Sequence, residues 1–168
     1  MKRLTLIALL LLLPLAAAPA RAGEITALAP ADVAELLAPP AQGVRVIMLW
    51  ALYCHYCEPN MATLAQWRAE QAGPAELILV STDPIAQRTA LEARLAAAGM
   101  QDQAARAYSE YSPERLNFLL DPNWGGELPR TLVIHADGHR AAVSGKLGEA
   151  QLQKLGLPAC RACAAAGT

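Results

Sequence analysis

Apolar residues fall into short runs separated by proline and glycine, and the spacing within each run predicts a secondary-structure element. Residues 44–51 are almost continuously apolar and rich in β-branched side chains in their first half, which predicts a strand buried on both faces. From about residue 56 to 71 the apolar residues recur at helical spacing, and Gly73-Pro74 ends the segment. Residues 77–80 are a second short apolar run, so this half of the chain predicts strand, helix and strand in that order.

The second half of the chain predicts helices first and strands afterwards. Ser81-Thr82-Asp83-Pro84 places a capping residue before proline, which is typical of a helix start, and Gly99 is well placed to cap a helix that reaches about residue 98. A further helix is expected over about residues 101–111, before Pro113. The elements expected after it are strands over residues 117–120, 131–135 and 141–144, with Asp137-Gly138 as a hairpin turn between the last two, and a helix over residues 148–155.

This order of elements predicts an α/β fold in which helices flank one mixed sheet. Helical crossovers make the early strands parallel, and the hairpin adds an antiparallel edge. Residues 23–42, with a short helical segment over residues 31–37, are interpreted as an N-terminal extension that packs on a domain over residues 43–157. Residues 158–168 are interpreted as a tail.

The first 22 residues have the pattern of a secretory signal peptide. Lys2 and Arg3 precede an apolar run over residues 4–18, and Ala20-Arg21-Ala22 supplies the small residues that a signal peptidase reads. An uncleaved membrane anchor is the alternative, but the run is shorter than the roughly 20 residues that a spanning helix needs, and it contains Pro14. We therefore expect cleavage after residue 22 and a periplasmic or secreted protein with no stable membrane insertion.

Charge argues against two classes of partner. The whole chain carries 14 basic and 15 acidic residues. The signal peptide removes Lys2, Arg3 and Arg21 and no acid, so the mature chain is acidic. Neither a nucleic acid nor an anionic membrane surface is expected as a partner.

The four cysteines form two C-x-x-C pairs after the signal peptide, Cys54 with Cys57 and Cys160 with Cys163. Disulfides persist in exported proteins, so both pairs raise the question of redox chemistry. A four-cysteine zinc site is the alternative. Zinc is disfavoured because such sites usually organise small metal-dependent folds, whereas this chain can build a core without metal. No metal and no other cofactor is expected.

The first pair lies where a buried strand meets a helix, and this position suits a reactive thiol. The helix N-terminus stabilises a thiolate through unpaired N–H groups and the helix dipole, and a second cysteine one turn inside can attack the mixed disulfide that forms. Cys54 is then the nucleophile and Cys57 the resolving thiol. His55 lies between them, and a cationic or hydrogen-bonding imidazole there would favour the thiolate; a solvated loop side chain is the alternative.

The strand-to-helix junction resembles the W-A-x-W-C-x-x-C motif of thioredoxins, since it reads Trp50-Ala51-Leu52-Tyr53-Cys54-His55-Tyr56-Cys57. Residues 128–134, which begin with Leu128-Pro129, resemble the second signature of that family. In the family a cis-proline precedes a strand and lies across from the cysteines. The resemblance implies that Pro129 does so here and that the backbone of Leu128 faces an extended substrate strand.

Among exported relatives the chain is most similar to the TlpA and ResA type, which carries an insertion after the second strand. Residues 84–113 match that insertion and are expected to hold the extra helices. The resemblance implies a thioredoxin-like thiol–disulfide oxidoreductase, and proteins of this type are usually reductants. Its expected partners are extracytoplasmic proteins with thiols or disulfides, and a redox protein that recycles the cysteine pair.

Two departures from thioredoxins bear on the chemistry. Thioredoxins carry a buried acid six residues before the first cysteine, which accepts the proton of the resolving thiol, and Met48 stands at that position here. Glu58, next to Cys57, is the nearest acid in sequence, although a first-turn glutamate that favours the helix dipole is an equal alternative. His55 and Tyr56 replace the Gly-Pro pair of reducing thioredoxins, which leaves the direction of electron flow open.

The second pair, Cys160 and Cys163, lies beyond the resemblance and outside any predicted core. A structural disulfide, a second redox centre and a metal-capturing tail are considered in that order. His135 and His139 flank the hairpin turn and are interpreted as solvated side chains rather than metal ligands. The alternative to an oxidoreductase is a thioredoxin-fold copper chaperone or binding protein, which would use the same cysteines and a histidine as soft ligands for copper(I).

Overall fold

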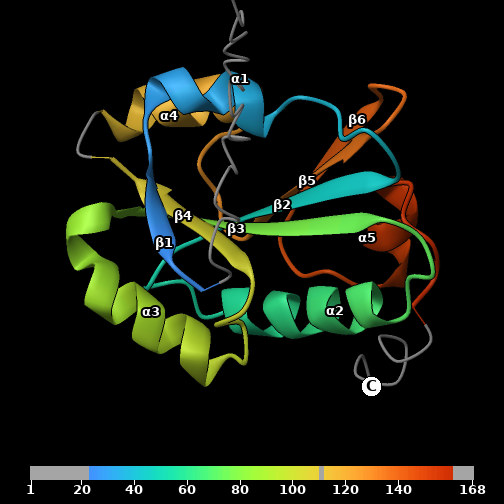
Figure 1. Ribbon diagram of the computed structural model, residues 1–168, viewed down its shortest axis with the longest axis horizontal. Helices are drawn as coiled ribbons and strands as arrows, with labels where there is room; N and C mark the ends of the chain where they lie inside the picture. The colour runs from blue at the N-terminus through green and yellow to red at the C-terminus, as the bar shows by residue number, and fades with distance from the viewer. Residues whose placement is uncertain (1–22, 110–111, 161–168) are drawn as a thin grey trace, which may run out of the picture.

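One mixed sheet organises the computed structural model, which describes residues 23–109 and 112–160 (Figure 1). Its strands lie in the order β1-β4-β3-β2-β5-β6. The first four in this order are parallel to one another, β5 runs antiparallel to β2, and β6 runs antiparallel to β5. The strands are β1 (Ile25–Leu28), β2 (Val44–Trp50), β3 (Ala75–Pro84), β4 (Ala104–Tyr108), β5 (Arg130–His135) and β6 (Arg140–Ser144).

Helices cover both faces of the sheet. Two separate buried clusters result, one on each face. Figure 1 shows α1 and α4 together above the sheet and α2 and α3 below it. The helices are α1 (Val33–Leu36), α2 (Cys57–Ala69), α3 (Arg88–Ala97), α4 (Pro113–Leu120) and α5 (Glu149–Lys154), and short 3-10 turns at Pro30–Asp32 and Ile85–Gln87 precede α1 and α3.

Strand β2 lies inside the sheet and is buried on both faces, as its continuous apolar run predicts. Val46, Met48 and Trp50 belong to the cluster that includes the apolar residues of α2, whereas Ile47 and Leu49 belong to the cluster under α1 and α4. All five side chains are at most 1 % exposed. Because alternate residues of a strand face opposite sides, β2 fixes the core of both layers at once.

The prediction of a mixed sheet flanked by helices is confirmed, and so is the hairpin at its antiparallel edge. Gly138 in the β5–β6 turn has a φ of +87°, a conformation that glycine adopts without strain. The N–H of His135 donates to the carbonyl of His139 at 2.9 Å, which closes the turn.

The segment before residue 43 contributes more than the packing extension that was expected. Residues 25–28 form β1, which pairs in parallel with β4 and completes one edge of the sheet. Ile25 is 1 % exposed and Leu28 is not exposed at all, so the two ends of this short strand anchor it in the two clusters.

The predictions for residues 81–120 were wrong in three places. The stretch 81–84 continues β3 rather than starting a helix, residues 104–108 form β4 rather than a helix, and residues 113–120 form α4 where a strand over 117–120 was expected. The expected helical insertion over 84–113 therefore holds one α-helix and a strand. Alanines at alternate positions of β4 are buried between two neighbouring strands, and this period is hard to see because alanine also favours helices.

At α4 the error was the reverse, since a strand was expected and a helix is present. Pro113 occupies its first turn, where a missing N–H costs least. Leu116 and Leu120, one turn apart, are buried, while Phe118 is 65 % exposed. The apolar run in this segment is only three residues long, at 118–120, and so short a run cannot distinguish a strand from a helix of this kind.

Candidate redox site

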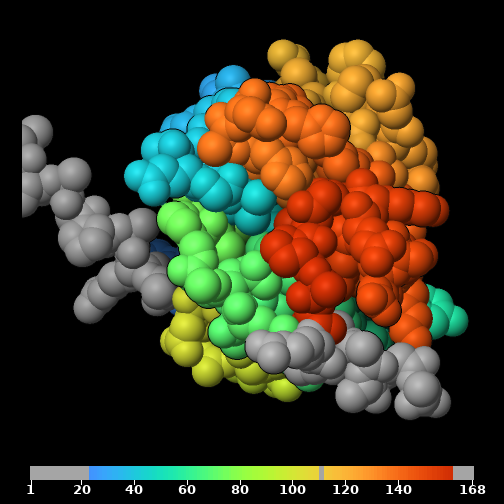
Figure 2. All heavy atoms as spheres, turned by 90° about the vertical axis from the view of Figure 1, so that its right-hand side faces the viewer, coloured from blue at the N-terminus to red at the C-terminus, as the bar shows by residue number. Residues whose placement is uncertain are grey.

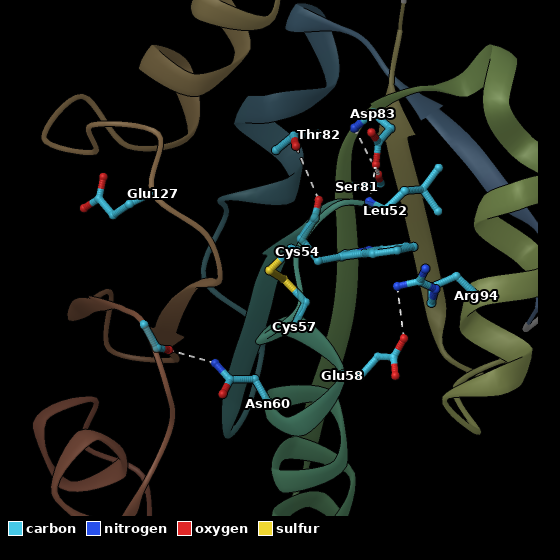
Figure 3. The surroundings of a disulfide bond; sticks show 12 residues. Leu52, Cys54, Cys57, Glu58, Asn60, Ser81, Thr82, Asp83, Arg94 and Glu127 are labelled. Carbon is cyan, nitrogen blue, oxygen red and sulfur yellow. Dashed lines mark hydrogen bonds and ion pairs between the residues drawn. A yellow bond between two sulfur atoms is a disulfide. The ribbon is translucent and has the colours of Figure 1, made fainter.

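Cys54 and Cys57 form a disulfide at the carboxyl end of β2, where the chain enters α2 (Figure 3). Their Cα atoms are 5.5 Å apart. Cys57 was expected one turn inside the helix, but it is the first residue of α2. Cys54 lies in the turn before the helix. Since the two sulfurs are bonded, the sulfur of Cys54 lies at the positive end of the helix dipole, beside N–H groups that have no partner within the helix.

Two successive turns hold the backbone of Cys54. Its N–H donates to the carbonyl of Ala51 at 3.0 Å, and its carbonyl accepts from the N–H of Cys57 at 3.2 Å. The backbone on both sides of this cysteine is therefore fixed before the regular helix begins.

The cysteines are recessed between exposed aromatic rings. Cys54 is 6 % exposed and Cys57 only 1 %, whereas Tyr53 and Tyr56 are 72 % and 69 % exposed. His55 is exposed as well. Of the two cysteines, Cys54 is the more exposed, and its role as the attacking thiol stays a prediction.

Beneath the pair the core is apolar, with two orphaned polar atoms. Trp50 is 1 % exposed and belongs to the same buried cluster as Cys54 and Cys57, so its side chain is not available at the surface. Met48 is fully buried at the position where thioredoxins carry an acid, and it pairs across the ladder with Thr131. Within the described residues neither Trp50 Nε1 nor Thr131 Oγ1 has a hydrogen-bond partner.

Glu58 forms an ion pair with Arg94 and not a contact with the cysteines. Its Oε1 lies 3.0 Å from Nη1 of Arg94 on α3, and both side chains are partly exposed. Figure 3 shows this ion pair on the side of α2 away from the disulfide. The pair leaves Glu58 poorly placed to accept the proton of Cys57.

The Leu128–Pro129 peptide bond is cis. Leu49 pairs with Arg130 across the β2–β5 ladder, so Pro129 lies at the same end of β2 as the cysteines. Pro129 is buried, and its carbonyl accepts from the N–H of Gly145 at 2.8 Å.

Polar side chains fasten the loop that carries Pro129. The guanidinium of Arg130, 12 % exposed, bonds to the carboxylate of Asp121 and donates to Ser144 Oγ at 2.9 Å. Ser144 in turn donates to Glu127 at 3.1 Å. Backbone N–H donation and this hydroxyl lower the pKa of the Glu127 carboxyl, so it is ionised beside the loop at neutral pH.

Ser81, Thr82 and Asp83 form a second set of site residues, which their pattern before Pro84 had predicted only as a helix cap. At the carboxyl end of β3, Thr82 and Asp83 bond to the backbone just before Cys54, and Ser81 bonds to the Asp83 carboxylate (Figure 3). The signal that could have found them is position, because the carboxyl ends of neighbouring parallel strands gather functional groups at one edge of a sheet.

Asn60 on α2 was also missed. It is 1 % exposed, donates from Nδ2 to the carbonyl of Gly145 at 2.9 Å, and accepts at Oδ1 from the N–H of Leu147 at 2.9 Å. The amide therefore ties the first turns of the cysteine helix to the loop between β6 and α5.

Cys160 is not part of a free tail. It is 4 % exposed, disulfide-bonded, and belongs to the same buried cluster as Cys54 and Cys57, whereas Cys163 lies outside the described residues. Gly156, with a φ of +69°, ends α5, and the N–H of Leu157 returns to the carbonyl of Leu152 at 2.9 Å. Figure 2 shows α5 and the residues after it (red) packed beside the β5–β6 hairpin (orange).

The hairpin histidines lie at the other end of the sheet from the cysteines. His135 pairs with Val44, where β2 begins, and its Nε2 lies 3.2 Å from the carbonyl of Leu155. The rings of His135 and His139 are 5.6 Å apart. Across residues 23–109 and 112–160, no three His, Cys, Asp or Glu side chains are grouped so that they could hold a metal ion.

Comparison with known proteins gives structural matches only: no protein-family model and no curated protein matches the chain. A thioredoxin-related protein from Neisseria meningitidis serogroup B has a TM-score of 0.52 at 20 % identity, over 68 % of this chain and 82 % of its own. A secreted disulfide oxidoreductase of Mycobacterium tuberculosis, homologous to E. coli DsbE, gives 0.50 at 15 % identity over 67 % and 79 %. The fold is thioredoxin-like. A secreted thiol-disulfide isomerase from Corynebacterium glutamicum matches this thioredoxin-like fold with a TM-score of 0.52 at 15 % identity, over 69 % and 70 %.

In this thioredoxin-like domain the two motifs identified in the sequence meet at one edge of the sheet. The cysteine pair comes from the β2–α2 junction and Pro129 from the start of β5, on the neighbouring strand. The likeness to the TlpA and ResA type in particular stays a prediction.

Proposed function

We propose that the protein is a thiol–disulfide oxidoreductase that reduces disulfides in extracytoplasmic protein clients. The observation that carries the proposal is the Cys54–Cys57 disulfide at the start of α2, next to the strand that begins after Pro129. A dithiol in this place has an activated outer sulfur and a buried inner one, which is what a two-step exchange needs.

The reaction begins with the reduced pair. The thiolate of Cys54 attacks one sulfur of a client disulfide, which forms a mixed disulfide and releases a client thiolate that takes up a proton. Cys57 then loses its proton, and its sulfur attacks the Cys54 sulfur. The intramolecular disulfide forms, the second client thiol leaves, and two electrons have passed from the pair to the client.

The direction of reduction follows from the likeness to exported reductants of the TlpA and ResA type. Recycling requires a partner dithiol that reduces the Cys54–Cys57 disulfide by the same two steps in reverse. His55 and Tyr56 between the cysteines set the reduction potential through their effect on the thiolate.

Placement outside the cytoplasm is supported by the signal-peptide pattern of residues 1–22, which lie outside the described residues, and by the description of two structural neighbours as secreted. In the part of the chain that the structure describes, no helix is long and apolar enough to cross a membrane.

The test is capture of the mixed disulfide. Cys57→Ser keeps the attacking thiol but removes the resolving one, so this variant should accumulate mixed disulfides with a model client such as a disulfide-bonded peptide. Cys54→Ser is the matched control and should capture none. Equal capture by both variants contradicts the assigned roles, and a reduced wild-type protein that binds copper(I) stoichiometrically without turning over the peptide supports the copper-binding alternative instead.

A further inference from the structure

The end of β3 reaches beyond its pairing with β2 and touches the loop that precedes the nucleophile. The last pair of the β2–β3 ladder is Trp50 with Ser81, yet β3 continues to Pro84. Asp83 Oδ2 accepts from the backbone N–H of Leu52 at 2.8 Å, and Thr82 Oγ1 donates to the carbonyl of Trp50 at 3.4 Å. Figure 3 shows both contacts above the disulfide.

The carboxylate of Asp83 is itself held in place. Ser81, whose side chain is fully buried, donates from Oγ to Asp83 Oδ2 at 3.0 Å and accepts at the same Oγ from the N–H of Asp83 at 3.0 Å. This short ring fixes the orientation of the carboxylate before it meets the loop. A hydrogen bond from a backbone N–H to a carboxylate is about twice as strong as a neutral one.

The bond from Leu52 acts on Cys54 through one turn. Ala51 and Cys54 close that turn by their backbone hydrogen bond, and Leu52 is its second residue. The N–H of Leu52 points out of such a turn, so the carboxylate supplies its partner. Fixing Leu52 therefore fixes the turn from which Cys54 emerges.

We infer that Asp83 is a positioning residue for the redox pair, which holds the Ala51–Cys54 turn so that the Cys54 sulfur meets its target in the productive orientation. The inference rests on the proposed function. Asp83 also places a negative charge against the backbone of Leu52, two residues before the nucleophile, which opposes the thiolate and holds the reduction potential of the pair lower than an uncharged partner would.

The substitutions Asp83→Ala and Asp83→Asn separate these two effects. Alanine removes the acceptor, so the turn loosens and the attack of Cys54 should slow by about tenfold, since a small misplacement of a reacting atom can cost up to about 10²-fold. Asparagine keeps an oxygen for Leu52 but removes the charge. It should therefore change the rate by less than about threefold while making the pair more oxidising.

Asp137 offers a matched control. Its carboxylate accepts from the backbone N–H of His139 at 2.9 Å in the β5–β6 turn, at the end of the sheet where β2 begins. Asp137→Ala and Asp137→Asn remove the same groups far from the cysteines, so both should leave the exchange rate and the potential unchanged.

The experiment measures two quantities on folded protein. One is the single-turnover rate at which oxidised glutathione oxidises the reduced pair, yielding the protein disulfide and two molecules of glutathione. The other is the potential from equilibration with glutathione buffers. If Asp83→Ala fails to fold, Ser81→Ala, which releases the carboxylate, takes its place and should slow the exchange several-fold.

The inference is overturned if the Asp83 or Ser81 variants match the Asp137 variants in both quantities. A loss of thermal stability alone, at an unchanged rate and potential, means an ordinary structural role and overturns it too. If the wild-type pair does not exchange with glutathione at all, the proposed function fails, and this outcome is distinct from the others.

Discussion

Asn60 should be among the costliest polar side chains to remove, because it joins the cysteine helix to a buried loop. Asn60→Ala deletes two hydrogen bonds and leaves the N–H of Leu147, on a residue only 3 % exposed, without an acceptor. Each lost bond costs about 1 kcal/mol and the stranded donor about 1–3 kcal/mol more, against about 0.5 kcal/mol gained in helix propensity. We expect a net loss of about 2.5–4.5 kcal/mol in the free energy of unfolding.

The assay is urea unfolding of oxidised protein, supported by thermal melts in which roughly 4 °C of Tm corresponds to 1 kcal/mol for a domain of this size. Gln66→Ala, at an exposed position of the same helix, is the control and should change the free energy by less than about 0.5 kcal/mol. If Asn60→Ala costs no more than Gln66→Ala, the two hydrogen bonds do not stabilise the fold and the reasoning is refuted.

Asn60→Asp adds a pH test of the same contacts. A carboxyl there can still accept from Leu147, but only its protonated form can donate to the carbonyl of Gly145, so its pKa in the folded state should rise above the unfolded value of about 3.9. Stability that depends on the protonated form is complete below the unfolded pKa and is lost as pH rises through the folded pKa. Relative to wild type, this variant should therefore be more destabilised at pH 8 than at pH 4, and a pH-independent difference would contradict the donor role.

Three further predictions test the site and its support. The alkylation rate of Cys54 in reduced protein, assigned by mass spectrometry, should titrate with a midpoint below about 8.5, and a midpoint at or above it would remove the activated thiolate. Burial raises the pKa of Tyr108, so the free energy of unfolding should hold up to about pH 10 and fall above it. Tyr108→Phe should make this fall with pH less steep, and an unchanged slope of stability against pH would point to other groups. Truncation after Leu157 removes Cys160 from the core and should lower the Tm by several degrees at an unchanged exchange rate, whereas several-fold slower recycling would mean that the second cysteine pair is a redox centre.

The elements predicted from the sequence are those whose apolar pattern has a single interpretation. Strand β2 is apolar throughout, α2 repeats at helical spacing, and the β5–β6 hairpin has a glycine turn signal. Strand β4 was missed because buried positions Ala105 and Ala107 are alanines, and α4 because the apolar run at residues 118–120 is short enough to suit a strand as well as a helix.

The site divides in the same way. Cys54, Cys57 and Pro129 belong to motifs that are contiguous in sequence, so they could be identified without coordinates. The side chains that support the site contact residues that are distant along the chain. Asp83 contacts Leu52 in the loop before Cys54, and Asn60 contacts residues of the β6–α5 loop. Such contacts depend on which strands become neighbours, and a capping pattern at the end of β3 carries no information about that.

The edge strand β1 has a consequence for how the chain matures. Its hydrogen-bonding partner in the sheet is β4, so a polypeptide that emerges N-terminus first holds Ile25–Leu28 unpaired until residue 108 has followed. Closing so long a loop costs conformational entropy before any contact repays it, which delays the final edge of the sheet relative to the β2–β3 core. During that interval the sheet has no finished edge on this side.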